Sequence, residues 1–189
     1  MKNIVLFASG SGSNVENIVQ YFQDKPNVTI ACVLTNKRDA KVLDRCNRLN
    51  VSSLCFNKIA FQETDCVLDI LKGTNPDLIV LAGFLWKIPE KIIKAFPNRI
   101  INIHPALLPK YGGKGMYGNK VHKAVRDNSD VESGITIHYV NENYDEGTII
   151  HQAKTKILPE DDVDDIAAKV HALEYNYFPK IIEQLLLAQ

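Results

Sequence analysis

The run from Asn102 to Pro109 places an amide and an imidazole two residues apart, directly after Arg99-Ile100-Ile101. Residues i and i+2 of a strand point to the same side, so Asn102 and His104 are predicted to face one small volume. Pro105 favours extended geometry at His104 and so holds the direction of the ring. An amide donor beside an imidazole suits stabilising an oxyanion and moving a proton. A polar strand end followed by a proline turn is the alternative interpretation.

A turn rich in glycine and serine, Ser9-Gly10-Ser11-Gly12-Ser13-Asn14, follows the first apolar run. Glycine allows backbone geometry and close approach that other residues disfavour. Ser13 and Glu16 have the spacing of a capping box, which predicts that a helix begins here. Backbone N–H groups at a helix N-terminus, together with the helix dipole, form an anion site. The turn is therefore predicted to bind a phosphate group.

Two other interpretations of this turn stay open, a dinucleotide site and a purely structural turn. A dinucleotide fingerprint would place a third glycine where Val15 stands. It would also place an acid at the end of the second strand, where the chain has Thr35 and Asn36. Simple phosphate binding therefore fits these residues better than a dinucleotide does.

Asp145 lies in the polar segment Asn141-Glu142-Asn143-Tyr144-Asp145-Glu146-Gly147. Aspartate favours turns, so an ordinary turn residue is the simpler interpretation. Open α/β sheets, however, bind ligands beyond the carboxyl ends of their strands. Ser9, Asn102 and the Asp145 segment all follow strands in that sense, so Asp145 could reach a histidine there.

Short apolar runs alternate with longer periodic segments, which predicts βαβ units and a parallel sheet with helices on both faces. The predicted strands are 4–8, 28–34, 53–56, 78–82, 99–103, 133–140 and 148–156, and the predicted helices are 14–23, 41–49, 62–72, 89–95, 119–127 and 161–187. The last two strands surround a polar turn, and a long helix closes the chain. We expect an α/β fold with a Rossmann-like, mostly parallel sheet, C-terminal antiparallel strands and a long C-terminal helix.

The chain has 189 residues, 46% of them hydrophobic, which predicts one domain with a sizeable core. Lys plus Arg and Asp plus Glu are 22 each, so binding to nucleic acid by bulk charge is not expected. The four cysteines lack the spacing of a zinc site or a disulfide framework and are predicted to be reduced core thiols. No run has the architecture of a signal peptide or the length of a membrane span, so we expect a cytoplasmic protein.

Three motifs together resemble the folate-dependent formyltransferases, and among them the glycinamide ribonucleotide formyltransferases of purine synthesis. The motifs are Gly10-Ser11-Gly12-Ser13-Asn14, Asn102-Ile103-His104-Pro105-Ala106-Leu107-Leu108-Pro109, and Gly134-Ile135-Thr136-Ile137-His138-Tyr139-Val140 with Asp145 and Gly147. The resemblance covers nearly the whole chain in order. The second motif with its downstream aspartate is specific for enzymes that use 10-formyltetrahydrofolate, and the first narrows the match to a phosphorylated substrate.

The resemblance implies transfer of a formyl group from 10-formyltetrahydrofolate, a co-substrate, to the amine of glycinamide ribonucleotide, with no metal. It implies catalytic roles for Asn102, His104 and Asp145. It assigns substrate binding to Gly12, Ser13, Asn14 and Glu174, and folate binding to Phe84, Leu85, Trp86, Lys87, Ile88 and Asn102. It also implies one formyltransferase domain over 1–189, with a phosphate-binding half, 1–100, and a catalytic and folate-site half, 101–189. Such a protein is expected to be a monomer or homodimer that acts on small molecules, without nucleic acid or membrane.

In the implied reaction, negative charge grows on the formyl oxygen, and Asn102 and a protonated His104 are expected to donate hydrogen bonds to it. Asp145 is expected to raise the pKa of His104, because a nearby opposite charge favours the imidazolium form. Two interpretations of His138 stay open, a plain strand residue and a residue of the site. His122 and His171 are predicted to lie on helix surfaces.

The chain departs from the family at three places. Trp86 stands where many members carry a basic residue. The loop from Gly112 to Gly118 is longer and richer in glycine than in other members, and Asn141 stands at a position that is uncharged or acidic in the common pattern. These departures concern the folate contacts rather than the catalytic trio.

Three alternatives stay open beside this function. A methionyl-tRNA formyltransferase is expected to carry an added tRNA-binding domain and basic surface. A formyltetrahydrofolate deformylase is expected to carry a regulatory domain. A non-catalytic nucleotide- or folate-binding module could use the same fold, but it would not require the trio of Asn102, His104 and Asp145.

Overall fold

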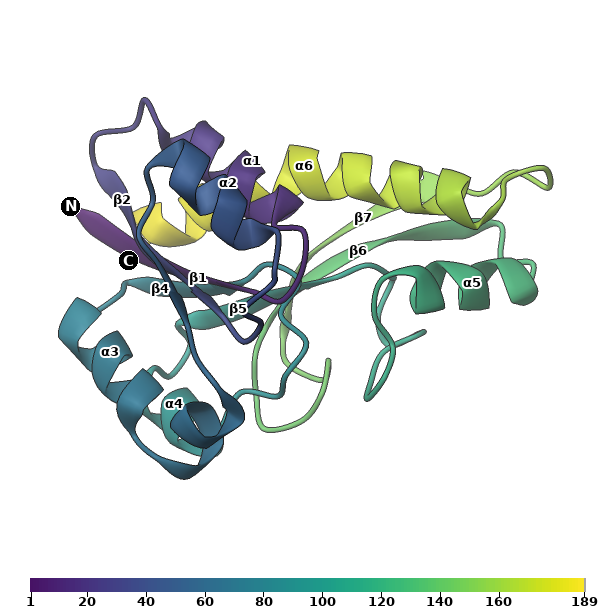
Figure 1. Ribbon diagram of the computed structural model, residues 1–189. Helices are drawn as coiled ribbons and strands as arrows, with labels where there is room; N and C mark the ends of the chain where they lie inside the picture. Colours follow the sequence, from purple (N-terminus) through teal and green to yellow (C-terminus); the bar gives the residue numbers. More distant parts are fainter. Residues whose placement is uncertain (189) are drawn as a thin grey trace. The chain divides into compact units, whose positions relative to one another are not determined.

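The computed structural model of the protein describes residues 1–188, and the chain divides into two compact units (Figure 1). The first unit contains residues 1–101 and the segment that begins at Leu185, and the second contains residues 102–184. Strand β5, Ile100–His104, contributes its first two residues to the first unit and its last three to the second.

The first unit is built from alternating strands and helices. Its elements are β1 (Lys2–Ala8), α1 (Ser13–Phe22), β2 (Val28–Thr35), α2 (Val42–Leu49), β3 (Ser53–Cys55), a π-helical turn (Ile59–Glu63), α3 (Cys66–Thr74), β4 (Leu78–Leu81) and α4 (Glu90–Ala95). Its strands pair in parallel in the order β3-β2-β1-β4. Figure 1 shows α1 and α2 on one face of this sheet and α3 and α4 on the other.

Burial on both faces explains the uniform apolar character of the central strands. All four residues of β4 and the residues Ile4 to Ala8 of β1 are buried. Four phenylalanines, Phe7, Phe56, Phe61 and Phe84, add an aromatic cluster beside the sheet, with ring centroids between 5.0 and 6.3 Å apart. The first unit therefore has a well-packed apolar core.

The second unit contains an antiparallel strand pair and two helices. These are α5 (Asn119–Asp127), β6 (Glu132–Tyr139), β7 (Ile149–Lys156) and most of α6 (Val163–Leu187). In Figure 1, α6 runs along one side of the β6–β7 pair and α5 lies on the other. A Cβ atom at Gly134 would lie 2.0 Å from the carbonyl oxygen of Ala153, so only glycine fits at this point of the pair.

The predicted fold class is confirmed. Hydrogen-bonded strands follow the order β3-β2-β1-β4-β5-β6-β7, with the antiparallel pair at the C-terminal end. The predicted elements match the observed ones closely, except that α3 begins at Cys66 rather than at position 62. Thr64 has an extended backbone there (φ −112°, ψ 173°), and it separates α3 from the preceding π-helical turn. Within residues 1–188, no helix is both long enough and apolar enough to cross a membrane.

Two other predictions are wrong. The capping box does not form: Gly12 takes the N-cap position with a left-handed backbone, and no side chain caps α1. The carboxylate of Glu16 instead forms ion pairs with Arg45 and Arg48 of α2, which are better partners for a carboxylate than an amide N–H.

The cysteines, predicted to be core thiols, are free but differ in burial. Only Cys46 is buried, Cys32 is half-buried, and Cys55 and Cys66 are exposed. Apolar neighbours in the sequence do not decide burial here, because Cys55 lies on the edge strand β3 and Cys66 begins a surface helix.

Candidate functional site

Asn102 and His104, both on β5, contact the same group of polar side chains in the second unit. An amide N–H of Asn102 donates to Nε2 of His138 at 3.1 Å, and the same nitrogen lies 3.5 Å from Oδ1 of Asp145. The structure thus brings together the two β5 residues that the i and i+2 spacing placed on one side.

The imidazole of His104 is 3% exposed and has a neighbour at each ring nitrogen. Nε2 lies 2.8 Å from the carbonyl oxygen of Tyr111. A carbonyl only accepts, so Nε2 carries the proton in this contact. The other nitrogen, Nδ1, lies 3.5 Å from Oδ2 of Asp145. A neutral His104 therefore presents the Nδ1 lone pair toward the Asp145 carboxylate.

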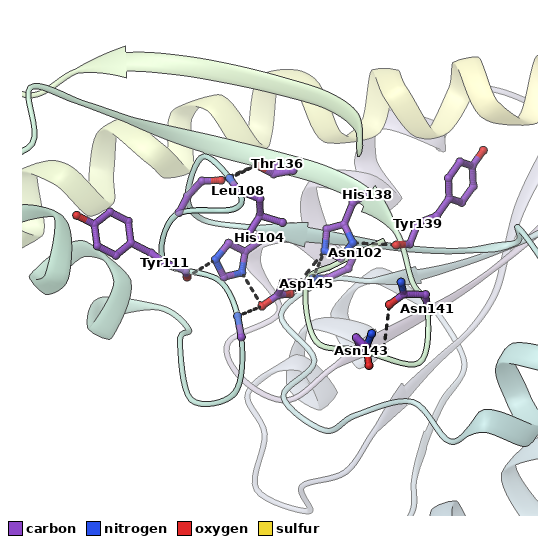
Figure 2. Close-up of polar contacts among 12 residues, drawn as sticks. Asn102, His104, Leu108, Tyr111, Thr136, His138, Tyr139, Asn141, Asn143 and Asp145 are labelled. Carbon is purple, nitrogen blue, oxygen red and sulfur yellow. Dashed lines mark hydrogen bonds and ion pairs between the residues drawn. The ribbon is translucent and has the colours of Figure 1, made fainter. Parts of the chain in front are cut away.

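Asp145 lies between the two histidines in Figure 2, in the turn that joins β6 to β7. Its carboxylate is 3.5 Å from Nδ1 of His104 and 3.6 Å from Nε2 of His138. The backbone N–H of Gly113 donates to Oδ2 at 2.9 Å, and the side chain is only 12% exposed. Asp145 has a left-handed backbone (φ 56°), so the turn directs this carboxylate inward instead of leaving it in solvent.

His138 belongs to the same cluster, which the sequence left open. Its Nδ1–H donates to the carbonyl oxygen of Tyr139 at 2.9 Å, so Nε2 is free to accept the hydrogen bond from Asn102. The register of the β6–β7 pair shifts between Ile137 and His138. Such bulges re-aim side chains and are frequent beside functional sites.

Two backbone groups of the site were missed from the sequence: the carbonyl of Tyr111 and the N–H of Gly113. Every residue type supplies these groups, so no residue pattern could have revealed them. Tyr111 and Gly113 both adopt positive φ, 56° and 97°, and the glycine-rich composition of this loop is the one signal that pointed to unusual backbone geometry.

Burial and neighbouring groups act in opposite directions on the pKa values of His104 and Asp145. Burial lowers the pKa of His104, and this outweighs the charge of Asp145 and the hydrogen bond to Tyr111, which both raise it. Asp145 does raise the pKa of His104, as expected, but the expectation of a protonated His104 is wrong for the free site, because burial of the imidazole lowers this pKa more. Burial raises the pKa of Asp145, but His138, His104 and the Gly113 N–H together lower it more. The free site thus pairs a neutral His104 with an ionised Asp145.

We expect Gly147→Ala to lower stability and to distort the cluster. A Cβ at Gly147 would lie 1.7 Å from the carbonyl oxygen of Tyr139 and 3.5 Å from Nδ1 of His138, so the turn must shift. Steric overpacking of this kind costs about 1–3 kcal/mol. Thermal unfolding and the NMR chemical shifts of the His138 ring measure the two effects. Gly73→Ala is the control, because a Cβ there meets no atom within 4 Å. Equal unfolding temperatures for both variants would contradict the prediction.

The glycine turn of the first unit connects β1 to α1 and is fastened to α2. The N–H of Val42 donates to the Gly10 carbonyl at 3.2 Å, and Nε of Arg45 donates to the Ser11 carbonyl at 2.7 Å. Gly12 has φ 73°, and a Cβ there would lie 2.4 Å from Cγ2 of Val42. The carbonyl groups of the turn thus face α2, while the first N–H groups of α1 precede any intrahelical partner. This geometry suits an anion next to Gly12, Ser13 and Asn14.

The segment predicted to bind folate, which follows β4, is partly core. Phe84 and Ile88 are 8% and 3% exposed, whereas Leu85 and Lys87 are exposed and Trp86 is half-buried. The hydroxyl of Ser9 holds the segment, because it accepts the N–H of Leu85 at 3.0 Å and donates to Oδ1 of Asn36 at 2.7 Å. Only Leu85, Trp86 and Lys87 offer substantial surface to a ligand.

A second polar group of the second unit contains the predicted substrate residue Glu174. Glu174 is 5% exposed and accepts a hydrogen bond from Nδ1 of His171 at 2.9 Å, which raises the pKa of His171. His122, predicted on a helix surface, is 1% exposed, and its burial lowers its pKa. The surface prediction for His122 is wrong because its side of α5 packs inward with Val121 and Val125. Among residues 1–188, no group of three or more His, Cys, Asp or Glu could hold a metal ion.

Comparison with known proteins matches residues 2–182 to the family model described as formyl transferase. The chain is 36% identical over 189 residues to the phosphoribosylglycinamide formyltransferase of Haemophilus influenzae, covering 97% of this chain and 86% of that one. It is 37% identical to the chloroplastic phosphoribosylglycinamide formyltransferase of Arabidopsis thaliana, covering 96% of this chain but only 64% of the plant protein.

A solved structure agrees with these sequence matches. Glycinamide ribonucleotide transformylase 1 from Geobacillus kaustophilus superposes with a TM-score of 0.88 at 33% identity, covering 98% of this chain and 99% of that one. Since the family model spans nearly the whole chain and this fold matches from end to end, the protein belongs to the formyl transferase family.

Proposed function

We propose that the protein transfers a formyl group from 10-formyltetrahydrofolate to the primary amine of glycinamide ribonucleotide. The observation that carries this proposal is the placement of Asp145 within 3.6 Å of both His104 and His138, beside the amide of Asn102. A module that only binds a ligand has no need for four converging polar side chains of which two, His104 and His138, are buried. Asn102, His104 and Asp145 take the catalytic roles in this proposal.

In the reaction, the amine attacks the formyl carbon and a tetrahedral intermediate forms with negative charge on the formyl oxygen. The N–H of Asn102 that lies 3.5 Å from Asp145 makes only a weak contact, so it is available to that oxygen. The bond from the formyl carbon to N10 of the folate then breaks and the amide remains. The proton leaves the amine and ends on N10 of tetrahydrofolate, so no oxidant or metal is required.

His104 supports this reaction in its neutral form. Its Nε2–H donates to the Tyr111 carbonyl in the free protein. This hydrogen bond must break before the same N–H can donate to the formyl oxygen. Nδ1 can accept a proton from the amine through water, and the nearby Asp145 carboxylate stabilises the imidazolium that results. The buried histidine therefore changes charge during the reaction rather than before it.

The remaining assignments follow from the same function. Gly12, Ser13 and Asn14 bind the phosphate of the ribonucleotide, Glu174 contacts the rest of that substrate, and Phe84 to Ile88 form part of the folate site. The two halves implied above, 1–100 and 101–189, act as one formyltransferase domain. We also propose a cytoplasmic monomer or homodimer that acts on small molecules without nucleic acid or membrane.

The decisive experiment is a steady-state assay that compares glycinamide ribonucleotide with its dephosphorylated form. We expect formyl transfer to both amines, with a much lower kcat/KM for the form that lacks the phosphate. Release of tetrahydrofolate is followed by absorbance, and Asp145→Asn serves as the inactive reference. Equal kcat/KM values for the two amines would refute the phosphate site, and no transfer to either amine would refute the proposed function.

Gly12→Val should raise KM for glycinamide ribonucleotide more than KM for the formyl donor. A side chain at position 12 meets Val42 and strains the left-handed backbone, so the turn loses the close approach that a phosphate needs. Gly10→Ala is the matched control, because a Cβ at Gly10 meets nothing within 4 Å. An unchanged KM for the ribonucleotide in folded Gly12→Val protein would mean that the turn is only structural.

A further inference from the structure

The side chain of Tyr111 is bound at a distance from His104, and none of the roles assigned above involves it. In Figure 2 its ring points away from His104, whereas its backbone carbonyl accepts the Nε2–H of His104 at 2.8 Å. The Tyr111 hydroxyl donates to Oδ2 of Asp130 at 2.8 Å and accepts a hydrogen bond from Nδ2 of Asn128 at 2.9 Å. Tyr111 is therefore held at both its carbonyl and its hydroxyl.

The two partners of the hydroxyl lie in the hydrogen-bonded turn between α5 and β6. Asn128 directly follows α5, and its backbone N–H donates to the Ala124 carbonyl at 3.1 Å. The backbone N–H of Asp130 donates to the Val125 carbonyl at 3.2 Å. Burial raises the pKa of Tyr111 and Asp130 raises it further, so the phenol keeps the proton that it donates. The hydroxyl is thus anchored to the end of α5.

The backbone at Tyr111 depends on such an anchor. Tyr111 has φ 56°, a left-handed conformation that a bulky residue rarely adopts. Two residues later, the N–H of Gly113 donates to Oδ2 of Asp145 at 2.9 Å. The segment 111–113 therefore supplies a carbonyl to His104 and an N–H to Asp145. Because an unfavourable backbone conformation persists only where its surroundings hold it, the contacts of the Tyr111 ring support both of these hydrogen bonds.

A neutral His104 has one ring proton and two acceptors that compete for it. The Tyr111 carbonyl lies 2.8 Å from Nε2, and Oδ2 of Asp145 lies 3.5 Å from Nδ1. A carboxylate is the stronger acceptor at equal distance, so the short approach of the carbonyl is what keeps the proton on Nε2. If the carbonyl withdraws, the proton moves to Nδ1. The imidazole then has no Nε2–H for the formyl oxygen and no Nδ1 lone pair for the amine proton.

We propose that Tyr111 is a positioning residue: its hydroxyl, bound to Asp130 and Asn128, holds the carbonyl that keeps the His104 proton on Nε2. The side chain acts through its own backbone and contacts no reacting atom in the mechanism above. Its effect on catalysis rests on the proposed function, whereas its effect on the His104 tautomer does not.

The test locates the ring proton of His104 by NMR in the wild type and in Tyr111→Phe. Nitrogen chemical shifts distinguish a protonated from an unprotonated ring nitrogen, and comparison with His104→Ala assigns the signals. Burial lowers the pKa of His104, so the ring is neutral at neutral pH. We expect Nε2–H in the wild type and a shift of the population toward Nδ1–H in the variant. The kcat should fall about threefold to tenfold, the factor by which one hydrogen bond biases an equilibrium, while KM for both substrates stays unchanged.

Changes at Asp130 separate the hydrogen bond from the packing of the ring. Asp130→Ala should shift the tautomer in the same direction, and the double variant should shift it no further than Tyr111→Phe alone, because both changes remove the same bond. Asp130→Asn keeps an acceptor for the hydroxyl and should retain the Nε2–H tautomer. Glu132→Ala is the matched control, since this nearby carboxylate pairs with Lys154 instead.

Three results would each overturn the proposal: a wild-type His104 with its proton on Nδ1, an unchanged tautomer in folded Tyr111→Phe, or an equal shift in Glu132→Ala. A fall in kcat without a change of tautomer belongs with these results, because general distortion of the loop would then explain it. If Tyr111→Phe does not fold, Asp130→Ala and Asp130→Asn provide the same comparison. The expected tautomer shift in a protein without transferase activity would refute the proposed function and leave the effect of Tyr111 on His104 standing.

Discussion

His104→Ala should lower kcat about a hundredfold to a thousandfold while the protein stays folded. Loss of one oxyanion donor typically raises the barrier by about 2.7–4 kcal/mol. His104 also has Asp145 next to Nδ1, so the variant loses the group that changes charge during the reaction as well as the donor. The measurement is single-turnover formyl transfer at saturating substrates, which separates the chemical step from binding.

The buried position of His104 requires a check on folding. The variant leaves the Tyr111 carbonyl without its donor, and an unsatisfied buried group costs about 1–3 kcal/mol. His151→Ala is the matched control: it removes the same side chain from β7, where the His151 ring lies tilted against Tyr177, with the ring centroids 4.9 Å apart. Near-wild-type turnover in folded His104→Ala protein would rule out its role at the formyl oxygen.

The fold was predictable because its signals are local. Apolar runs such as the one from Leu78 to Leu81 are long enough to identify a strand buried on both faces, and their alternation with periodic segments predicts parallel pairing. The errors fall where a partner distant in the sequence decides the outcome. Glu16 does not make its predicted capping contact, because it forms ion pairs with Arg45 and Arg48 of α2.

The site was predictable only in part. The spacing of Asn102 and His104 shows that they share a side, but nothing local shows that the turn after β6 returns Asp145 to them. His138 joins them through a bulge in the β6–β7 pair, and bulges have no reliable sequence signature. The net direction in which the His104 pKa is shifted could not be predicted either, because it depends on how deeply tertiary packing buries the ring.

Asp145→Asn should lower kcat about a hundredfold to ten-thousandfold, the range that a positioned acid–base group contributes. The amide keeps the shape of the carboxylate but carries no charge, so it cannot stabilise an imidazolium at His104. In the wild type, burial lowers the pKa of His104 and the charge of Asp145 partly opposes this. Removing that charge should lower the His104 pKa further, and the acidic limb of the pH–rate profile should move to lower pH.

NMR titration of His104 in the wild type and in Asp145→Asn tests this pairing directly. The same His104 pKa in both proteins would contradict it. Glu146→Gln is the matched control, because Glu146 is the adjacent carboxylate and its Oε2 accepts a hydrogen bond from Asn143 rather than from the site. It should leave both the His104 pKa and kcat unchanged.

Substrate affinity separates the role of Asp145 from a general distortion of the turn. KM for the ribonucleotide should stay close to the wild-type value, since its phosphate is bound by Gly12, Ser13 and Asn14 in the proposed function. A large rise of that KM together with the loss of kcat would show that Asp145 shapes the turn and does not act on the reacting groups.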